Sequence, residues 1–131
     1  MKTKAFTLIE LMVVILIVGI LAAASVPLMR GRIESAKWSE ANATAGTIRS
    51  AARVLFVEKG AAAVPTGALD ATKMAALGFS AGDLNGTYFI FSDYSIGAPD
   101  ANGNVSVTVT GSQPNAPSGS KTLSQDGKTW Q

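Results

Sequence analysis

Uncharged residues fill the chain from Leu11 to Met29, and most of them are large and apolar. A helix of that length reaches roughly 28 Å, because each residue adds about 1.5 Å, and this matches the hydrocarbon core of a bilayer. The pattern therefore predicts a membrane-spanning helix. One carboxylate, Glu10, lies just inside the front of this helix, where a charge is costly unless it has a partner.

The pattern becomes amphipathic between Ile33 and Glu58, where apolar residues recur at three- and four-residue steps. This spacing places them on one face of a helix, which predicts that the face packs on a folded head. Gly60 is a suitable stop for that helix. Residues 6–59 are therefore expected to form one long helix of about 80 Å, with or without a kink. The apolar face comprises Trp38, Ala41, Ala45, Ile48, Ala52, Leu55 and Phe56.

The rest of the chain predicts short elements separated by turns. Residues 61–87 are expected to form a connector in which Asp70 caps a short helix that Gly78 ends. Strict alternation at 104–110 predicts a strand whose valines face the helix. Further strands are expected at 87–93, 121–123 and 128–130, hairpin turns at Asn102-Gly103 and Asp126-Gly127, a turn at 84–87, and an exposed loop at 111–120. The predicted fold is α+β, with one long N-terminal helix packed on a small antiparallel sheet.

The charge balance gives no sign of the dense basic stripe that binds nucleic acid. The chain of 131 residues has 11 Lys and Arg against 9 Asp and Glu, and two of the basic residues are Lys2 and Lys4. It has no cysteine and no histidine, so no disulfide can form, and the commonest general base and metal ligand are missing. The chain is therefore predicted not to be an enzyme.

Two local patterns suggest chemistry and are set aside. Residues 78–82 fit the G-x-S-x-G pattern of serine hydrolases, but that elbow needs a strand before it, a helix after it and a base to accept the proton of Ser80. Residues 100–104 match part of a calcium loop, but the glycine comes too early and no Glu closes the motif, so a turn is expected. No catalytic, cofactor-binding or metal-ligating residue is assigned.

The motif from Lys4 to Val14 resembles the cleavage signature of type IV prepilins and type II secretion pseudopilins. In that family a prepilin peptidase cuts on the cytoplasmic side, immediately before the Phe, and methylates the new amine. The resemblance implies a cut between Ala5 and Phe6. The family usually has Gly before the cut, and Ala is small enough that processing is expected. The resemblance covers residues 4–30, and the predicted architecture of helix and sheet is also that of the pilin head.

The same resemblance implies roles for three more residues. Glu10 would pair, in the filament, with the methylated amine of Phe6 on a neighbouring subunit, whereas the residue alone indicates only an acid that favours the helix dipole. Gly19 and Pro27 coincide with family positions between which the helix loses regular structure in filaments. Both residue types are also common in plain membrane helices, and Pro27 alone predicts a kink, so the alternatives stay open.

Basic residues after the apolar run conflict with the topology of that family. Arg30, Arg32 and Lys37 follow the run, against Lys2, Lys4 and the chain's amine before it. The positive-inside rule alone would place the C-terminal part in the cytoplasm. The family places it outside, and that topology is the one predicted, because the leader must face a cytoplasmic peptidase.

The sequence is thus interpreted as a leader at 1–5, a transmembrane and filament-core half-helix at 6–29, an amphipathic half-helix at 30–60 and a head at 61–131. The implied function is a structural subunit of a type IV pilus. It would be stored in the bacterial inner membrane with its head outside the cytoplasm and later be exposed at the cell surface. The implied partners are copies of itself, minor pilins or pseudopilins, the prepilin peptidase and the inner-membrane assembly platform.

Two other functions are alternatives. A pseudopilin of a type II secretion system shares this N-terminus, and the lack of cysteine slightly favours it, because many pilins carry a C-terminal disulfide loop. A conventionally secreted soluble binding domain, cut after Ala24, is the alternative from a different class. Major pseudopilins hold calcium in the head, so calcium is compatible with the late acids Asp93, Asp100 and Asp126, but no ligand is assigned.

Overall fold

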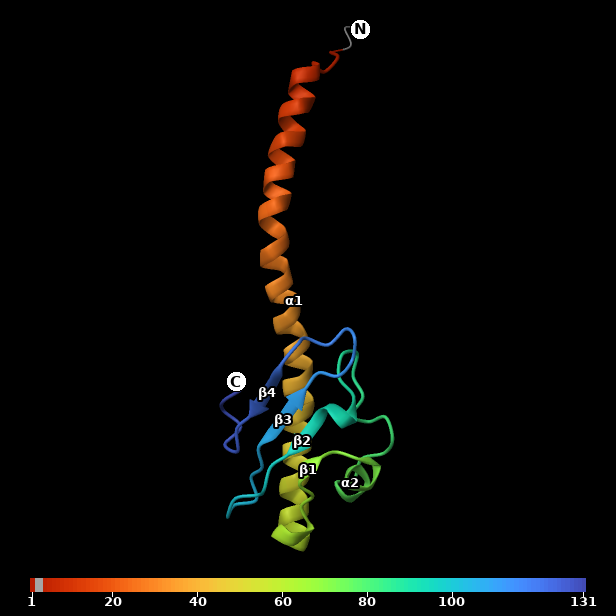
Figure 1. Ribbon diagram of the computed structural model, residues 1–131, viewed down its shortest axis with the longest axis vertical. Helices are drawn as coiled ribbons and strands as arrows, with labels where there is room; N and C mark the ends of the chain where they lie inside the picture. The colour runs from red at the N-terminus through yellow and green to blue at the C-terminus, as the bar shows by residue number, and fades with distance from the viewer. Residues whose placement is uncertain (2–3) are drawn as a thin grey trace. The chain divides into compact units, whose positions relative to one another are not determined.

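The computed structural model describes Met1 and residues 4–131 (Figure 1), so Lys2 of the predicted leader lies outside the described residues. Its longest element is helix α1, Leu8–Lys59, of 52 residues. The chain forms two compact units, residues 1–35 and residues 36–131. We call these units the N-terminal segment and the head, and each is described by itself.

The N-terminal segment consists of an irregular start and the first part of α1. Every described residue of this segment is exposed in the single chain. Helix α1 is long and apolar enough to cross a membrane, with a mean hydropathy of 2.8 over its most apolar window. Gly19 and Pro27 both lie within regular helix. The predicted break between them concerns the filament, and it therefore stays a prediction.

The head is built around the second part of α1. Its buried residues are those that the three- and four-residue spacing predicts, so the amphipathic pattern is confirmed. Small side chains recur along this face, which lets the sheet approach the helix closely. Gly60, with a φ of 86°, follows the last residue of α1 as predicted. The buried residues of α1 are Trp38, Ala41, Ala45, Ile48, Ala52 and Leu55, and Phe56 is partly buried beside them.

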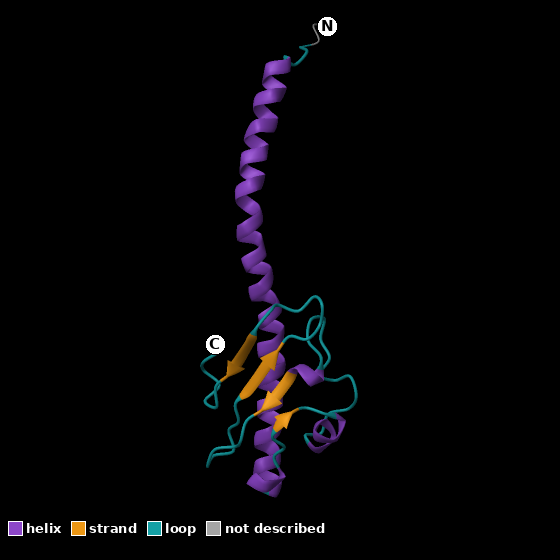
Figure 2. Ribbon diagram, viewed as in Figure 1, coloured by secondary structure: helices purple, strands orange, loops and turns teal. Residues whose placement is uncertain are grey.

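Four short strands form one antiparallel sheet, which lies against α1 within the head (Figure 2). They follow one another in space as in the sequence, in the order β1-β2-β3-β4, so each pairs with the next. Val107 is opposite Ile96 on one side and Leu123 on the other, which fixes the register. The α+β fold is therefore confirmed. The strands are β1 Gly67–Ala68, β2 Tyr94–Ile96, β3 Val107–Thr110 and β4 Ser120–Leu123.

The alternating segment before and within β3 supplies much of the core. Val105, Val107 and Val109 are fully buried, whereas the residues between them are partly exposed, as the alternation predicts. The turn before this segment is also as predicted, since Gly103 has a φ of 78° and lies against the helix. A Cβ atom at Gly103 would come within 2.5 Å of the Phe56 ring, so both the backbone angle and the space require glycine.

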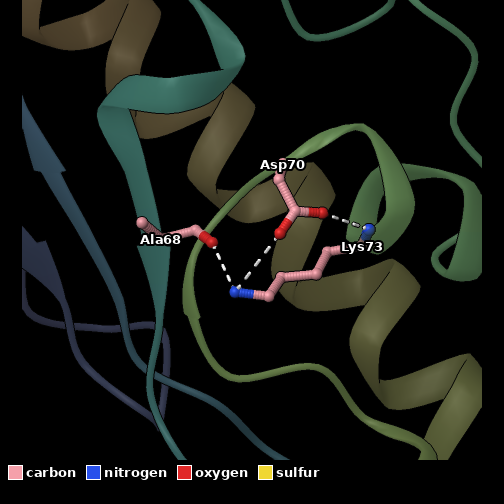
Figure 3. Close-up of polar contacts among 3 residues, drawn as sticks. All are labelled: Ala68, Asp70 and Lys73. Carbon is pink, nitrogen blue, oxygen red and sulfur yellow. Dashed lines mark hydrogen bonds and ion pairs between the residues drawn. The ribbon is translucent and has the colours of Figure 1, made fainter.

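The connector contains the predicted capped helix, α2, Ala71–Ala76. The Asp70 side chain accepts the backbone N–H of Lys73 at 2.9 Å, which satisfies one free donor of the helix start. The Lys73 ammonium lies 3.7 Å from the same carboxylate and donates to the Ala68 carbonyl at 2.7 Å (Figure 3). Lys73 thereby ties α2 to strand β1. Gly78, with a φ of 86°, follows the helix.

The predicted strand at 87–93 is wrong. Only bends and a 3-10 turn, Phe91–Asp93, occupy this stretch, and strand β2 begins at Tyr94. The physical reason is that side chains take the backbone donors that a sheet would need. The N–H of Tyr88 donates to Glu40, that of Ile90 to Asp93 and that of Phe91 to Asn85. Residues 85–93 therefore follow a path that carboxylate and amide oxygens hold in place.

Smaller corrections concern the edges of the sheet. Strand β1 lies where a loop was predicted, and the turn predicted at 84–87 comes earlier, at 81–84. The final hairpin is present, but its second arm is a single bridge between Leu123 and Trp130 rather than a strand. Thr122 and Gln131 exchange two backbone hydrogen bonds beside that bridge, at 2.6 and 3.3 Å. The 111–119 stretch is a largely exposed loop, as predicted.

Candidate functional site

The start of α1 carries a complete capping box. Thr7 precedes the first helical residue, and its backbone N–H and its hydroxyl both donate to Glu10 Oε2, at 2.9 and 2.8 Å. In return, the Glu10 N–H donates to the Thr7 hydroxyl at 3.3 Å. Each side chain thus satisfies a backbone donor that the helix start leaves without a partner. The helix consequently begins at Leu8.

Sequence reasoning expected Glu10 near the front of the helix, and it lies in the first turn of α1, but its partner within the chain was missed. A Thr followed three residues later by a Glu, just before an apolar run, is the sequence signature of this box. That signal was available in the printed sequence. It gives Glu10 a local role in the single chain, beyond a favourable position in the field of the helix dipole.

The capping box leaves the predicted cleavage site outside the helix. Ala5 and Phe6 both precede Thr7, both are exposed, and neither is helical. A carboxylate has acceptor sites for about four hydrogen bonds, so the two bonds from Thr7 leave Glu10 able to accept from another group. The site therefore combines an accessible peptide bond with a carboxylate that still has acceptor capacity. Cleavage and pairing with a second chain both stay predictions.

The part of α1 that follows this site, residues 11–29, is apolar on all sides of the helix. Large side chains such as Leu8, Ile15 and Leu28 are 70–75% exposed in the single chain. Apolar surface of this extent is stable only in contact with lipid or with other apolar surface. The first part of α1 is therefore suited to a bilayer and to a bundle of identical helices.

The head does not provide the geometry of a serine hydrolase. Ser80 follows helix α2 and lies at the start of a turn, whereas the nucleophile elbow needs a strand before the serine and a helix after it. Its backbone N–H donates to Asp83 at 2.7 Å, which is a local turn contact.

The predicted turn at Asp100 is formed by the carboxylate itself. Asp100 Oδ1 accepts the backbone N–H groups of Asn102 and Asn104, each at 2.8 Å, and Oδ2 accepts from the Asn104 side chain at 3.1 Å. These bonds from Asn104 are the main reason that the pKa of Asp100 is lowered. Across Met1 and residues 4–131, no three His, Cys, Asp or Glu residues lie close enough to form a metal site.

Arg49 joins this turn to the final hairpin, a role that sequence reasoning did not assign. Its guanidinium donates to the Gln125 carbonyl at 2.9 and 2.5 Å and to Asn104 Oδ1 at 3.2 Å. Hydrogen bonds from Ser124 and Lys128 lower the pKa of Asp126, and the charge of Arg49 lowers it further. Arg49 is the residue after Ile48 of the apolar face, and its partners come from loops far away in the sequence. No local pattern could therefore predict these contacts.

Two comparisons with known proteins find a match. The family model for the prokaryotic N-terminal methylation motif matches residues 1–26. The type IV narrow pilus major component PilA5 of Thermus thermophilus is 42% identical over 66 residues, which are 50% of this chain and 55% of that protein. The chain thus spans about half the length of this relative. No solved structure matches. The chain therefore carries a prokaryotic N-terminal methylation motif and is similar to the major component of a type IV narrow pilus.

Proposed function

We propose that this protein is the structural subunit of a type IV pilus. It is made as a precursor, cut between Ala5 and Phe6, methylated on the new amine and polymerised through α1. The observation that carries the proposal is the start of α1. There the Glu10 carboxylate forms a capping box with Thr7, and an apolar stretch of helix, exposed on all sides, follows it directly in the sequence. The matched methylation motif and the similarity to a pilus component support it.

Before assembly, the apolar part of α1 anchors the chain in the inner membrane, with the head outside the cytoplasm. The Thr7 hydroxyl and N–H stabilise the Glu10 carboxylate at this stage, which lowers the cost of holding a charge near the edge of the bilayer. The carboxylate therefore has a partner in the single chain, before any second subunit arrives.

In the filament, the α1 helices of many subunits pack together, and apolar contact supplies most of the cohesion. Apolar contact alone does not select one register. The methylated amine of Phe6 on a neighbouring subunit supplies the missing specificity by pairing with Glu10, because a buried opposite-charge pair forms at only one offset between the helices. Gly19 and Pro27 allow the helix to lose regular structure between them in this packed state.

The protein acts with partners rather than as an enzyme. A prepilin peptidase removes residues 1–5 and methylates Phe6, and an inner-membrane platform adds the subunit to the filament. Copies of the same chain, with related minor pilins, form the fibre at the cell surface.

A pseudopilin of a type II secretion system is the second candidate. The observation that favours it is the absence of cysteine, and hence of a C-terminal disulfide loop. The similarity to a major pilus component favours the pilus instead. A domain cut after Ala24 is the weaker alternative, because that cut would fall within helix α1.

The test is the mass of the N-terminal peptide, measured separately for sheared surface material and for membranes. The expected peptide begins at methylated Phe6 and is abundant in the sheared fraction. An Ala5→Gly variant, which has the residue usual before the cut, is the positive control for processing. The same peptide confined to membranes would favour the pseudopilin. A start at Met1 or near Ser25 in both fractions would refute the prepilin function.

A further inference from the structure

Both tryptophans of the chain lie in one aromatic cluster of the head. The Trp38 ring lies 5.4 Å from the Phe89 ring and 6.0 Å from the Trp130 ring, measured between centroids. Trp38 is part of α1, and Trp130 pairs with Leu123 near the end of the chain. Since the chain has two tryptophans, its tryptophan fluorescence reports on this cluster alone.

Two partly exposed lysines lie against the aromatic rings. The Lys37 ammonium lies 4.8 Å from the Tyr88 ring centroid and donates to the Asn115 carbonyl at 2.6 Å. The Lys121 ammonium lies 5.9 Å from the Trp38 ring centroid. Lys37 and Trp38 open the head unit, which begins at residue 36, so the group lies where the chain enters the head. We call Lys37, Tyr88, Lys121 and Trp130 the entry surface.

The charges of the entry surface are not balanced by an ion pair. Within the part of the chain that the structure describes, the one ion pair joins Lys73 to Asp70, outside this surface. The Glu40 carboxylate contacts the surface, and its Oε1 accepts the Tyr88 N–H at 2.9 Å. Each ammonium has three donors, so Lys37 has capacity beyond its bond to Asn115. The surface can therefore bind further anionic oxygens.

Lysine ammoniums beside partly buried Trp and Tyr rings are typical of protein surfaces at a membrane–water interface. In the sequence, Lys37 comes soon after Met29, the last residue of the apolar run, with Arg30 and Arg32 between them. These cations conflict with the positive-inside rule when the head is outside the cytoplasm. Anionic headgroups on that side would provide the anionic partner that these two lysines lack among the described residues.

We propose that, before assembly, the entry surface docks on anionic lipid headgroups of the bilayer that α1 crosses. The phosphate oxygens accept from Lys37 and Lys121, and the rings of Tyr88 and Trp130 lie at the headgroup level. The inference rests on the membrane insertion of residues 6–29 in the proposed function. It does not depend on filament formation, so the unassembled chain can test it.

The experiment uses the full chain in vesicles of phosphatidylcholine, with or without phosphatidylglycerol, each with a constant trace of lipid that carries a nitroxide on its headgroup. The nitroxide should quench tryptophan emission more strongly when phosphatidylglycerol is present, and added salt should reverse the effect. A lysine near an anionic surface favours the docked state by roughly fivefold, so Lys37→Gln with Lys121→Gln should lower the docked-to-free ratio on the order of twentyfold.

The matched control is Arg53→Gln with Lys59→Gln, which removes two exposed cations from the head outside the entry surface and should leave the quenching unchanged. Gln at position 37 can still donate to Asn115, and an unchanged emission maximum in detergent checks that each variant folds. Quenching that ignores phosphatidylglycerol, or that the entry-surface variant retains, would overturn the inference. Quenching that rises with protein density instead of anionic lipid would identify a second copy as the occupant and also overturn it.

Flotation of the vesicles separates this inference from the proposed function. A chain that floats with the vesicles but does not dock contradicts the inference alone. A chain that does not enter the vesicles contradicts the membrane insertion in the proposed function, and the inference falls with it.

Discussion

Replacing Glu10 by Gln separates the two roles proposed for this residue. Gln at the third helical position still accepts hydrogen bonds from Thr7, so the capping box and the start of α1 should persist. The negative charge is lost, and the amine of a neighbouring Phe6 then has no counter-ion. Leaving one buried charge without its partner costs about 3–5 kcal/mol, which is on the order of a hundredfold or more for each subunit added.

Glu10→Ala removes the Glu10 half of the capping box as well as the charge, whereas Thr7 can still accept the backbone N–H of residue 10. Loss of a capping side chain costs about 1 kcal/mol, so the first amides of α1 should exchange with solvent about fivefold faster. The amide of Thr7, which donates to Glu10 in the structure, is the most direct reporter. Glu10→Gln should keep the protection of this amide, and Glu10→Ala should lose it.

The first assay compares the amount of the chain in filaments sheared from cells with the amount retained in membranes. The second measures amide hydrogen exchange of the unassembled chain in lipid discs. Glu34→Gln is the matched control, because Glu34 is an exposed carboxylate of α1 that lies after the apolar run. Both Glu10 variants should insert in membranes and fail to form filaments. Filaments from Glu10→Gln at the level of the control would refute the charge pair, and equal loss of amide protection in both variants would refute the cap.

Three outcomes concern the head. Arg49→Ala should lower the free energy of unfolding by about 2 kcal/mol in urea denaturation, because its guanidinium holds two loop oxygens, whereas Arg53→Ala, at an exposed position, should change it by less than about 0.5 kcal/mol. Ile48→Ala should lower it by about 2–5 kcal/mol, since the side chain is fully buried, and a loss below about 1 kcal/mol would contradict that packing. Burial raises the pKa of Tyr94 to about 12, so the contribution of Tyr94 to the stability of the head should be constant below about pH 10 and fall towards pH 12, as the unfolded chain ionises first. Tyr94→Phe should flatten that part of the pH profile, and an unchanged slope would contradict the assignment.

The elements that the sequence predicted well are those with a local signal. Burial of Ala41, Ile48 and Leu55 follows from their spacing on one helix face, and burial of Val105 to Val109 follows from alternation. The cap at Asp70 and the turn at Gly103 depend on residues within a few positions of one another. Such features need no knowledge of the rest of the chain.

The failed strand at 87–93 shows the limit of that reasoning. Its aromatic residues favour a strand, but Tyr88 donates to Glu40, which lies 48 residues earlier in the chain. A contact over that distance depends on how the head packs, which no local pattern contains. Arg49, which binds loop atoms more than 50 residues away, was missed for the same reason.

The N-terminal site was only partly accessible from the sequence. The bond between Thr7 and Glu10 could have been predicted from their spacing, since a capping box is a local motif. The proposed pair between Glu10 and Phe6 joins two different chains, so neither the sequence pattern nor the structure of one chain contains its geometry. That part of the site depends on the experiments above.

The short edges of the head sheet bear on how such a protein avoids aggregation. Strand β1 has two residues, and on the other edge Thr122 of β4 already exchanges backbone hydrogen bonds with Gln131. A long open edge would offer unpaired backbone groups to the sheet of another copy, and crowded copies could then join through their heads. With both edges blunted, head-to-head strand addition is disfavoured. In the proposed filament, contact between copies would then be made by helix α1.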